Sequence, residues 1–278
     1  MKIAFIGGGN MATALIGGML KQGFAAADFS AVEPFETART KLAAQFGVAC
    51  TAAPSAALGD MDAIVMAVKP QNMREAAVTV APFLKAQLIV SIAAGVRIED
   101  LARWLGSTTG TASSPYASIV RCMPNTPALI GMGITGLYAA PAVSAAQRAS
   151  AERILRAVGD VVWLENEALI DPVTAVSGSG PAYVFYFLEA MAEAGVKLGL
   201  PADDVKRLAL ATFSGAAKLA AESPDDFATL RAKVTSKAGT TEAALKVMIE
   251  RQVKEAIGVA IHAASARGKE LGEMLGRD

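Results

Sequence analysis

The sequence predicts an α/β domain with a mainly parallel sheet, followed by an all-α domain. Short β-rich runs alternate with helical patterns over residues 1–165, whereas residues 166–278 carry long Ala/Leu/Val-rich helical patterns and no further strand signal. Strands that are joined through helices form parallel sheets covered on both faces. We therefore place the boundary between the two domains after residue 165.

The elements of the first domain follow from apolar runs that glycine or proline interrupts. Met11, Leu15 and Met19 keep helical spacing, and Gly47 marks the end of a second helix. The strands are expected at 2–6, 29–32, 63–68, 88–92, 119–123, 135–138 and 161–164. The helices between them are expected at 11–23, 35–46, 98–105 and 144–158.

Four helices are expected in the second domain, at 181–198, 202–221, 241–249 and 253–275. The first of them is apolar nearly all round, which is typical of a helix that is buried. More apolar surface is present than one helical domain readily covers, so we expect an obligate two-fold homodimer, which can assemble further into a ring.

Composition excludes several classes of protein. The 278 residues are 53% hydrophobic, and 26 basic residues balance 26 acidic ones, so the chain is not disordered and has no field that would attract nucleic acid. The uncharged stretch 122–147 is broken by prolines and glycines, and residues 1–7 are too short an apolar run for a signal peptide, so we expect neither a membrane span nor a cleaved leader. Only two cysteines are present, which favours a reducing, cytoplasmic compartment.

A glycine turn is the first functional motif. It follows the first strand, opens the first helix and fits the pattern G-x-G-x-x-G/A, in which Gly7 makes a sharp turn and Gly9 lets the backbone approach a pyrophosphate. Ala12 permits close packing of helix on strand. The motif predicts a Rossmann-type dinucleotide-binding domain, with a cofactor-binding turn made of Gly7, Gly8, Gly9, Asn10, Met11 and Ala12.

Glu33 lies just after the second strand, where the adenosine ribose of a dinucleotide is expected. A carboxylate there can accept hydrogen bonds from both ribose hydroxyls of NAD, and it would repel the 2′-phosphate of NADP unless a base such as Arg39 compensated. The alternative is a solvated loop glutamate beside Pro34. NADH and NADPH therefore both stay open.

Two further strand ends point to the same cofactor. Ala67, Lys69 and Pro70 follow one strand, and Ala93 and Ala94 follow the next. Ligands of such sheets bind at this edge, where Lys69 can present a cation and the alanines leave room for a flat ring. A surface lysine and a tight turn are the alternatives.

Three later motifs make the chain resemble pyrroline-5-carboxylate reductase over essentially its whole length. They are Arg-Cys-Met-Pro-Asn-Thr-Pro at 121–127, Ser-Gly-Ser-Gly-Pro-Ala-Tyr at 177–183 and Ser-Lys-Ala-Gly-Thr-Thr at 236–241. The family reduces the imine of 1-pyrroline-5-carboxylate to L-proline with NADPH or NADH, the last step of proline synthesis. The resemblance implies a dinucleotide domain and a helical dimerisation domain, and a cofactor site that includes Asn125.

The resemblance also implies a substrate site made of Glu167, Thr240 and Thr241, to which the glycine-containing turn at Ser177 and Gly178 can add a second wall. Thr240 and Thr241 follow Gly239 at a helix start, where free backbone N–H groups can bind a carboxylate and the Thr241 hydroxyl can reach the imine nitrogen as the catalytic group. The alternative makes Thr240 an N-cap and Thr241 the first helical residue. The motif at 177–183 is expected to open a helix. It can form a second wall of the substrate pocket or a corner where two helices meet. The assignment of Glu167 to the substrate site rests on the resemblance alone.

The sequence lacks the residues that hydrolases and metal enzymes require. His262, the sole histidine, lies in an Ala-rich helix, Ser179 lacks the nucleophile elbow, and no metal-ligand spacing occurs, so neither a hydrolase nor a metal site is expected. The alternatives that stay open are another imine or hydroxyacid reductase of this architecture and a regulatory protein that binds NAD(P) without turnover. A hydroxyacid enzyme would need a lysine on the long helix, and 181–195 has none.

Three features depart from the family pattern. Lys237 and Ala238 replace the Pro-Gly of the usual Ser-Pro-Gly-Gly-Thr-Thr, which affects the geometry of the substrate loop. Pro54 and Ser55 stand where many members have an asparagine near the adenosine ribose, and the 106–118 loop is longer than usual.

Overall fold

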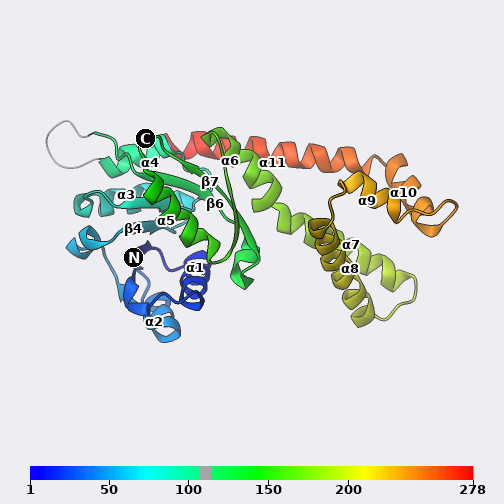
Figure 1. Ribbon diagram of the computed structural model, residues 1–278, viewed down its shortest axis with the longest axis horizontal. Coiled ribbons are helices and arrows are strands. Elements are labelled where there is room, and N and C mark those ends of the chain that lie inside the picture. The colour runs from blue at the N-terminus through cyan, green and yellow to red at the C-terminus, as the bar shows by residue number, and fades with distance from the viewer. Residues whose placement is uncertain (107–113, 278) are drawn as a thin grey trace. The chain divides into compact units, whose positions relative to one another are not determined.

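The computed structural model describes residues 1–106 and 114–277, which form two compact units (Figure 1). The first unit consists of Met1–Ser179 together with Ala264–Asp278, and the second unit of Gly180–Ala263. The first unit contains the sheet, and the second is helical. The two fold classes predicted from the sequence are therefore confirmed.

The described part of the first unit contains one eight-stranded sheet with the order β3-β2-β1-β4-β5-β6-β7-β8. Neighbouring strands are parallel except for the antiparallel pair β6 and β7. Chain order reverses between β1 and β4, which in such sheets opens a ligand crevice at the carboxyl ends of the strands. The strands are β1 (Ile3–Ile6), β2 (Phe29–Val32), β3 (Ala49–Thr51), β4 (Ala63–Met66), β5 (Leu88–Ser91), β6 (Ile119–Met123), β7 (Gly133–Ala139) and β8 (Gly159–Trp163).

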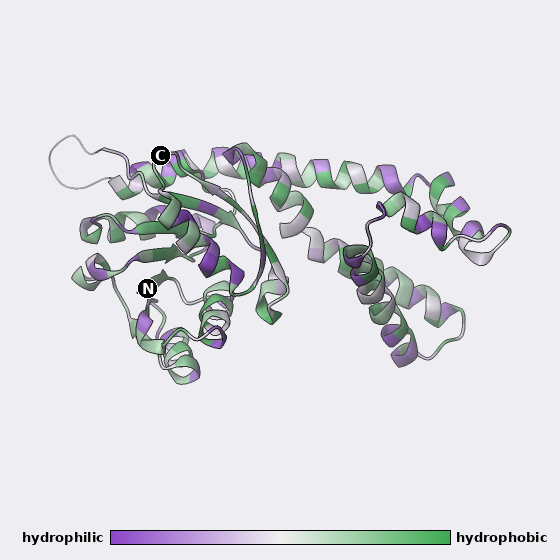
Figure 2. Ribbon diagram, in the orientation of Figure 1, coloured by the Kyte–Doolittle hydropathy of each residue, from purple (hydrophilic) through white to green (hydrophobic). Residues whose placement is uncertain are grey.

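Helices cover both faces of this sheet because its central strands are apolar on both sides (Figure 2). Ile3 and Phe5 of β1 belong to one buried apolar cluster, and Ala4 and Ile6 to a second. The first cluster includes residues of α1 and α5, and the second residues of α3 and α4. These helices are α1 (Asn10–Lys21), α2 (Glu36–Phe46), α3 (Met73–Val80), α4 (Ile98–Gly106) and α5 (Ala145–Arg156). Of the expected 106–118 loop, residues 107–113 lie outside the described residues.

The second unit has little internal core. Phe187 and Phe213 make an edge-to-face contact at 5.8 Å, and Val205 is buried close to Gly195. No residue of α7, the helix that is apolar nearly all round, is buried within the chain. The helices are α7 (Gly180–Lys197), α8 (Ala202–Glu222), α9 (Phe227–Lys233), α10 (Thr240–Glu250) and α11 (Val253–Leu275), whose last part belongs to the first unit.

The two compact units divide after Ser179 and again after Ala263, whereas the sequence analysis placed one boundary after residue 165. The last strand, β8, ends close to that residue, at Trp163. The short helix α6 (Ile170–Val173) belongs to the first unit, where it packs on β7. A Cβ placed on Gly136 of β7 would lie only 2.7 Å from Val173 Cγ1. The end of α11 belongs to the same unit, with Leu275 against Gly95. None of the described helices has both the length and the apolar run that crossing a membrane requires.

Candidate functional site

The glycine turn lies against the carboxyl ends of β2 and β4. Gly7 has a φ of +100°, and its N–H donates to the Val32 carbonyl at 2.8 Å. A Cβ on Gly7 would lie 2.8 Å from the Ala67 carbonyl oxygen, so the position requires glycine. Gly9, the N-cap of α1, has open space where a Cβ would project. A phosphate group can therefore approach the backbone at Gly9 and the start of α1.

The carboxylate of Glu33 faces this turn. Glu33 is only 7% exposed, and its Oε2 accepts a hydrogen bond from the Gly8 N–H at 2.8 Å while its Oε1 accepts one from the Phe35 N–H at 2.9 Å. The alternative of a solvated loop residue is therefore wrong. Arg39 Nη1 donates to the Glu33 and Pro34 carbonyl oxygens at 2.8 and 2.6 Å. A carboxylate that suits a free ribose and a guanidinium that suits a 2′-phosphate thus lie at the same strand end.

The loops after β4 and β5 meet this edge as well. Lys69 is exposed, and Pro70 begins a short turn directly after it. Ala93 is buried, Ala94 is half-buried, and Gly95 turns the chain with a φ of +76°. Because β4 and β5 are parallel partners, both loops emerge on the side of the sheet where the glycine turn lies. The predicted cofactor residues of three loops are therefore gathered at one edge.

Three other predicted site residues, Asn125, Ser177 and Gly178, make contacts within the first unit. Asn125 accepts a hydrogen bond from the Ile134 N–H at 3.0 Å, so its side chain fixes the start of β7. Gly178 faces Met123, whose Cε would lie 2.5 Å from a Cβ at that position. The Ser177 hydroxyl donates to the Val173 carbonyl at 3.0 Å.

The segment Thr174–Gly178 forms a π-helical turn between α6 and α7. As the sequence predicted, the motif at 177–183 opens a helix, because α7 begins at Gly180 with Pro181 in its first turn. The wider turn is closed by the Ser179 N–H, which donates to the Thr174 carbonyl at 2.8 Å. Such turns occur frequently at functional sites.

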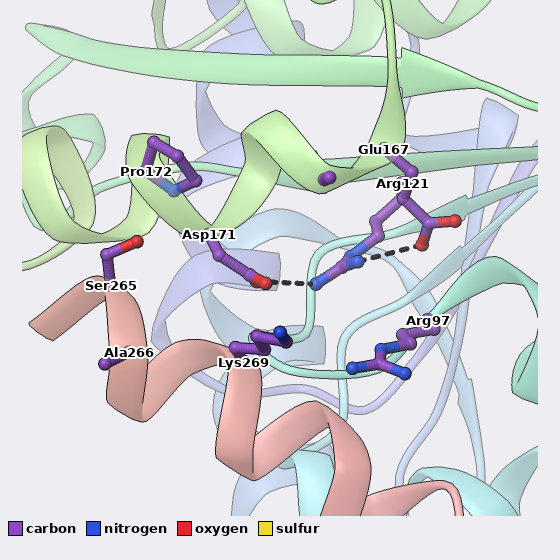
Figure 3. A pocket seen from close by; sticks show the side chains of 9 residues that line it. Arg97, Arg121, Glu167, Asp171, Pro172, Ser265, Ala266 and Lys269 are labelled. Carbon is purple, nitrogen blue, oxygen red and sulfur yellow. Dashed lines mark hydrogen bonds and ion pairs between the residues drawn. The ribbon is translucent and has the colours of Figure 1, made fainter.

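Glu167 borders a charged cavity of about 470 Å³ in the first unit (Figure 3). Arg121 is only 3% exposed, and its Nη1 donates to Glu167 Oε1 at 2.8 Å. Its Nη2 lies 3.5 Å from Asp171 Oδ1, and its Nε is buried without a hydrogen-bond partner. The cavity lining consists of Arg97, Arg121, Glu167, Ala168, Asp171, Pro172, Ser265, Ala266 and Lys269.

The sequence analysis did not identify Arg121 as a site residue. The signal that could have found it is an arginine inside the apolar strand 119–123, because a buried charge requires a charged or hydrogen-bonding partner. Asp171 and Lys269 carried no comparable signal, since both lie in helical segments where charged residues are common.

Thr240 and Thr241 belong to the second unit, whereas the other predicted site residues belong to the first. Gly239 is the N-cap of α10, and Thr240 is its first residue. The alternative in which Thr240 caps the helix and Thr241 begins it is therefore wrong. Thr240 is exposed and Thr241 half-buried, beside backbone N–H groups that have no partner within the helix.

The described part of the chain keeps its potential metal-ligating side chains scattered and its two thiols unreactive near neutral pH. No cluster of three or more metal-ligating side chains occurs among the described residues, and His262 is exposed. Cys50 and Cys122 are free. Burial raises the pKa of both thiols; at Cys50, Arg39 lowers the pKa and Glu33 raises it. Both thiols are therefore neutral near pH 7.

Comparison with known proteins places the chain in a family. Residues 167–271 match a family model described as pyrroline-5-carboxylate reductase dimerisation, and residues 2–95 match one described as NADP oxidoreductase coenzyme F420-dependent. The pyrroline-5-carboxylate reductase of Pseudomonas aeruginosa is 48% identical over 277 residues, which cover 99% of this chain and 98% of that protein. The chain belongs to the pyrroline-5-carboxylate reductase family.

Solved structures of this family have the same fold. A pyrroline-5-carboxylate reductase from Coxiella burnetii is 36% identical, with a TM-score of 0.87 over 97% of this chain and 98% of that one. The Plasmodium falciparum pyrroline carboxylate reductase, solved with NADP bound, is 28% identical, with a TM-score of 0.84 over 98% of both chains. These full-length matches, together with the NADP oxidoreductase family model, identify the chain as an NAD(P)H-dependent oxidoreductase.

Membership of the pyrroline-5-carboxylate reductase family gives the replacement at 237–238 a physical meaning. Ala238 has a φ of +57°, in the left-handed region where glycine is favoured. Its N–H donates to Glu242 Oε2 at 2.7 Å, a hydrogen bond that ties the loop to the first turn of α10. The chain therefore keeps the glycine-like turn of the usual motif with an alanine, supported by a carboxylate.

Proposed function

We propose that this chain reduces 1-pyrroline-5-carboxylate to L-proline by hydride transfer from NAD(P)H, the last step of proline biosynthesis. The observation that carries the proposal is the 48% identity over the full length to a pyrroline-5-carboxylate reductase. The fit of the cofactor supports it, because the open space at Gly9 and the inward carboxylate of Glu33 lie at the strand edge where a dinucleotide binds.

The residues of the chain chiefly position the reactants. A bound nicotinamide supplies the hydride, and the protonated cyclic imine accepts it at its carbon, so no strong acid is needed. We assign the turn Gly7–Ala12 and Lys69 to phosphate and ribose binding, and Ala67, Pro70, Ala93, Ala94 and Asn125 to the walls around the cofactor. We assign Ser177, Gly178 and Thr240 to substrate binding, and Thr241 to a hydrogen bond with the imine nitrogen.

A spectrophotometric assay tests the proposed function. Purified protein, mixed with 1-pyrroline-5-carboxylate and either NADPH or NADH, is expected to consume the cofactor and form L-proline in equal amounts. Consumption with a different cyclic imine or a 2-keto acid alone would indicate another reductase of this architecture. Cofactor binding with no turnover of any of them would indicate a regulatory protein.

Replacing Thr241 by alanine is expected to lower kcat/KM by about tenfold or more, a loss of about 1.4 kcal/mol of transition-state stabilisation. The reason is the loss of a hydroxyl beside the carboxylate-binding start of α10. Thr241→Ser keeps the hydroxyl and serves as the matched control, with kinetics close to wild type. Unchanged kinetics in a folded Thr241→Ala variant would make Thr241 an ordinary helix residue.

Replacing Glu33 by serine is expected to shift cofactor preference toward NADPH. The variant removes the carboxylate that repels a 2′-phosphate and keeps the Arg39 guanidinium that would attract it. The measurement is the ratio of kcat/KM for NADPH to that for NADH in both proteins. A ratio that does not move would show that Glu33 does not face the adenosine ribose.

We further propose an obligate two-fold homodimer, able to form rings of dimers, in a reducing cytoplasm. Large apolar side chains of the second unit are exposed in the single chain, including Phe185 at 65% and Tyr186 at 75%. Burying them against a second copy accounts for a helix that is apolar nearly all round. Sedimentation at micromolar concentration is expected to show no monomer, and a fully active monomer would contradict the dimer.

A further inference from the structure

The loop at 93–97 joins β5 to α4 and is held on one side by the last part of α11. Gly95 lies against Leu275 and Leu271, which would be 3.2 and 3.4 Å from a Cβ at this position. Arg97 lies beside Gly272, with its Nε 3.1 Å from where a Cβ on that glycine would project. The last part of α11 therefore covers this side of the loop.

The other side of the loop is fixed through Glu167. The N–H of Ile98, the first residue of α4, donates to Glu167 Oε1 at 2.8 Å. The first N–H groups of a helix have no partner within the helix, so a carboxylate from a distant segment supplies one here. The same oxygen accepts the hydrogen bond from Arg121 at 2.8 Å.

Arg121 makes this attachment rigid because it lies in the sheet. Its side chain is 4% exposed and stands on β6, which is hydrogen-bonded to β5 on one side and β7 on the other. Glu167 Oε1 therefore joins the first N–H of α4 to Arg121 of β6, and Figure 3 shows its contact with Arg121. The Oε1 atom of Glu167 thus accepts hydrogen bonds from one buried arginine and one backbone N–H.

We propose that Glu167 is a positioning residue for hydride transfer, which acts by holding the start of α4 and thereby the loop at 93–97 against the nicotinamide. This inference rests on the proposed function for the assignment of Ala93 and Ala94 to the cofactor. It differs from a direct substrate contact, the role that resemblance assigns to Glu167. The two roles make different predictions for cofactor affinity.

The first test compares Glu167→Ala with Glu167→Gln. Glutamine keeps an oxygen that can accept from Ile98 and Arg121, whereas alanine removes it. For Glu167→Ala, we expect the Kd of NAD(P)H, measured by cofactor fluorescence without substrate, to rise about tenfold. We also expect kcat to fall, the KM for 1-pyrroline-5-carboxylate to stay unchanged, and the deuterium isotope effect on kcat to increase. Glu167→Gln is expected to stay within about threefold of wild type in each quantity.

A second variant removes the donor and leaves Glu167 in place. Ile98→Pro deletes the N–H at the first position of α4, where proline is well tolerated. We expect the cofactor Kd to rise as in Glu167→Ala, whereas a substrate-contact role predicts no change. Asp171→Asn is the control, because it weakens the second partner of Arg121 without touching Ile98, and its cofactor Kd is expected to stay within about twofold of wild type.

Two results would overturn the inference. A raised KM for 1-pyrroline-5-carboxylate in both Glu167 variants, with cofactor Kd unchanged, would make Glu167 a substrate contact. If Glu167→Ala changes neither the cofactor Kd nor the kinetics and only lowers the melting temperature, the Glu167 side chain has a purely structural role. Because cofactor affinity is measured without substrate, this part of the test stands even if the wild-type protein acts on a different imine.

Discussion

A Gly9→Ala variant is expected to fold normally and to bind NAD(P)H about 10- to 100-fold more weakly than wild type. The φ of Gly9 is −71°, which alanine adopts freely, and no atom lies within 4 Å of the added Cβ. The methyl group would instead occupy space at the start of α1 and displace the pyrophosphate from backbone donors whose charge-assisted hydrogen bonds contribute about 1.5–3 kcal/mol each. Cofactor fluorescence titration and thermal unfolding of the same sample check both halves of this prediction.

Gly7→Ala is the matched contrast. Gly7 has a φ of +100°, and its Cβ would meet the Ala67 carbonyl, so alanine is expected to destabilise the fold by at least about 1–3 kcal/mol. The Gly7 and Gly9 variants thus distinguish an effect on folding from an effect on cofactor binding. Normal cofactor affinity in Gly9→Ala would show that the pyrophosphate does not approach this part of the turn.

Replacing Arg121 by methionine is expected to lower the free energy of unfolding by about 3 kcal/mol. Methionine fills similar space, but Glu167 and Asp171 lose the buried guanidinium that both carboxylates face. Two partly buried carboxylates that lose their shared guanidinium make this change costly. Urea denaturation at neutral pH measures the loss.

Arg156 provides a control with the same chemistry on the surface. It also bridges two carboxylates, Glu152 at 2.8 Å and Asp160 at 2.7 Å, but its side chain is 49% exposed. Arg156→Met is therefore expected to cost no more than about 1 kcal/mol. An equal loss of unfolding free energy in the two variants would mean that the burial of Arg121 does not add to its effect on stability.

Local signals in the sequence were sufficient for most elements of the sheet domain. The apolar run at 29–32 coincides with β2, and Gly47, with a φ of +69°, ends α2 where the sequence predicted. Both depend only on residues close in sequence. β3 was not predicted because it is an edge strand of three residues without a buried position, so it leaves no apolar run.

Pairings over long distances in sequence could not be predicted. The gathering of the ends of β1, β2, β4 and β5 at one edge could be predicted, because parallel strands bring their carboxyl ends together whatever the packing details. The contact between Arg121 and Glu167 spans 46 residues, and no periodicity indicates which carboxylate a buried arginine will choose. For the same reason, helical periodicity predicted α11 correctly and did not indicate that its last part packs on the loop at Gly95.

The way α11 returns to the first unit has a consequence for biosynthesis. Residues 264–277 are translated after the whole of the helical unit, although they pack on a loop that follows β5. While they are still inside the ribosome, the emerging sheet domain lacks Leu271 and Leu275, and the loop at 93–97 has no apolar cover on that side. We expect the nascent domain to form its strands before residues 264–277 reach this loop.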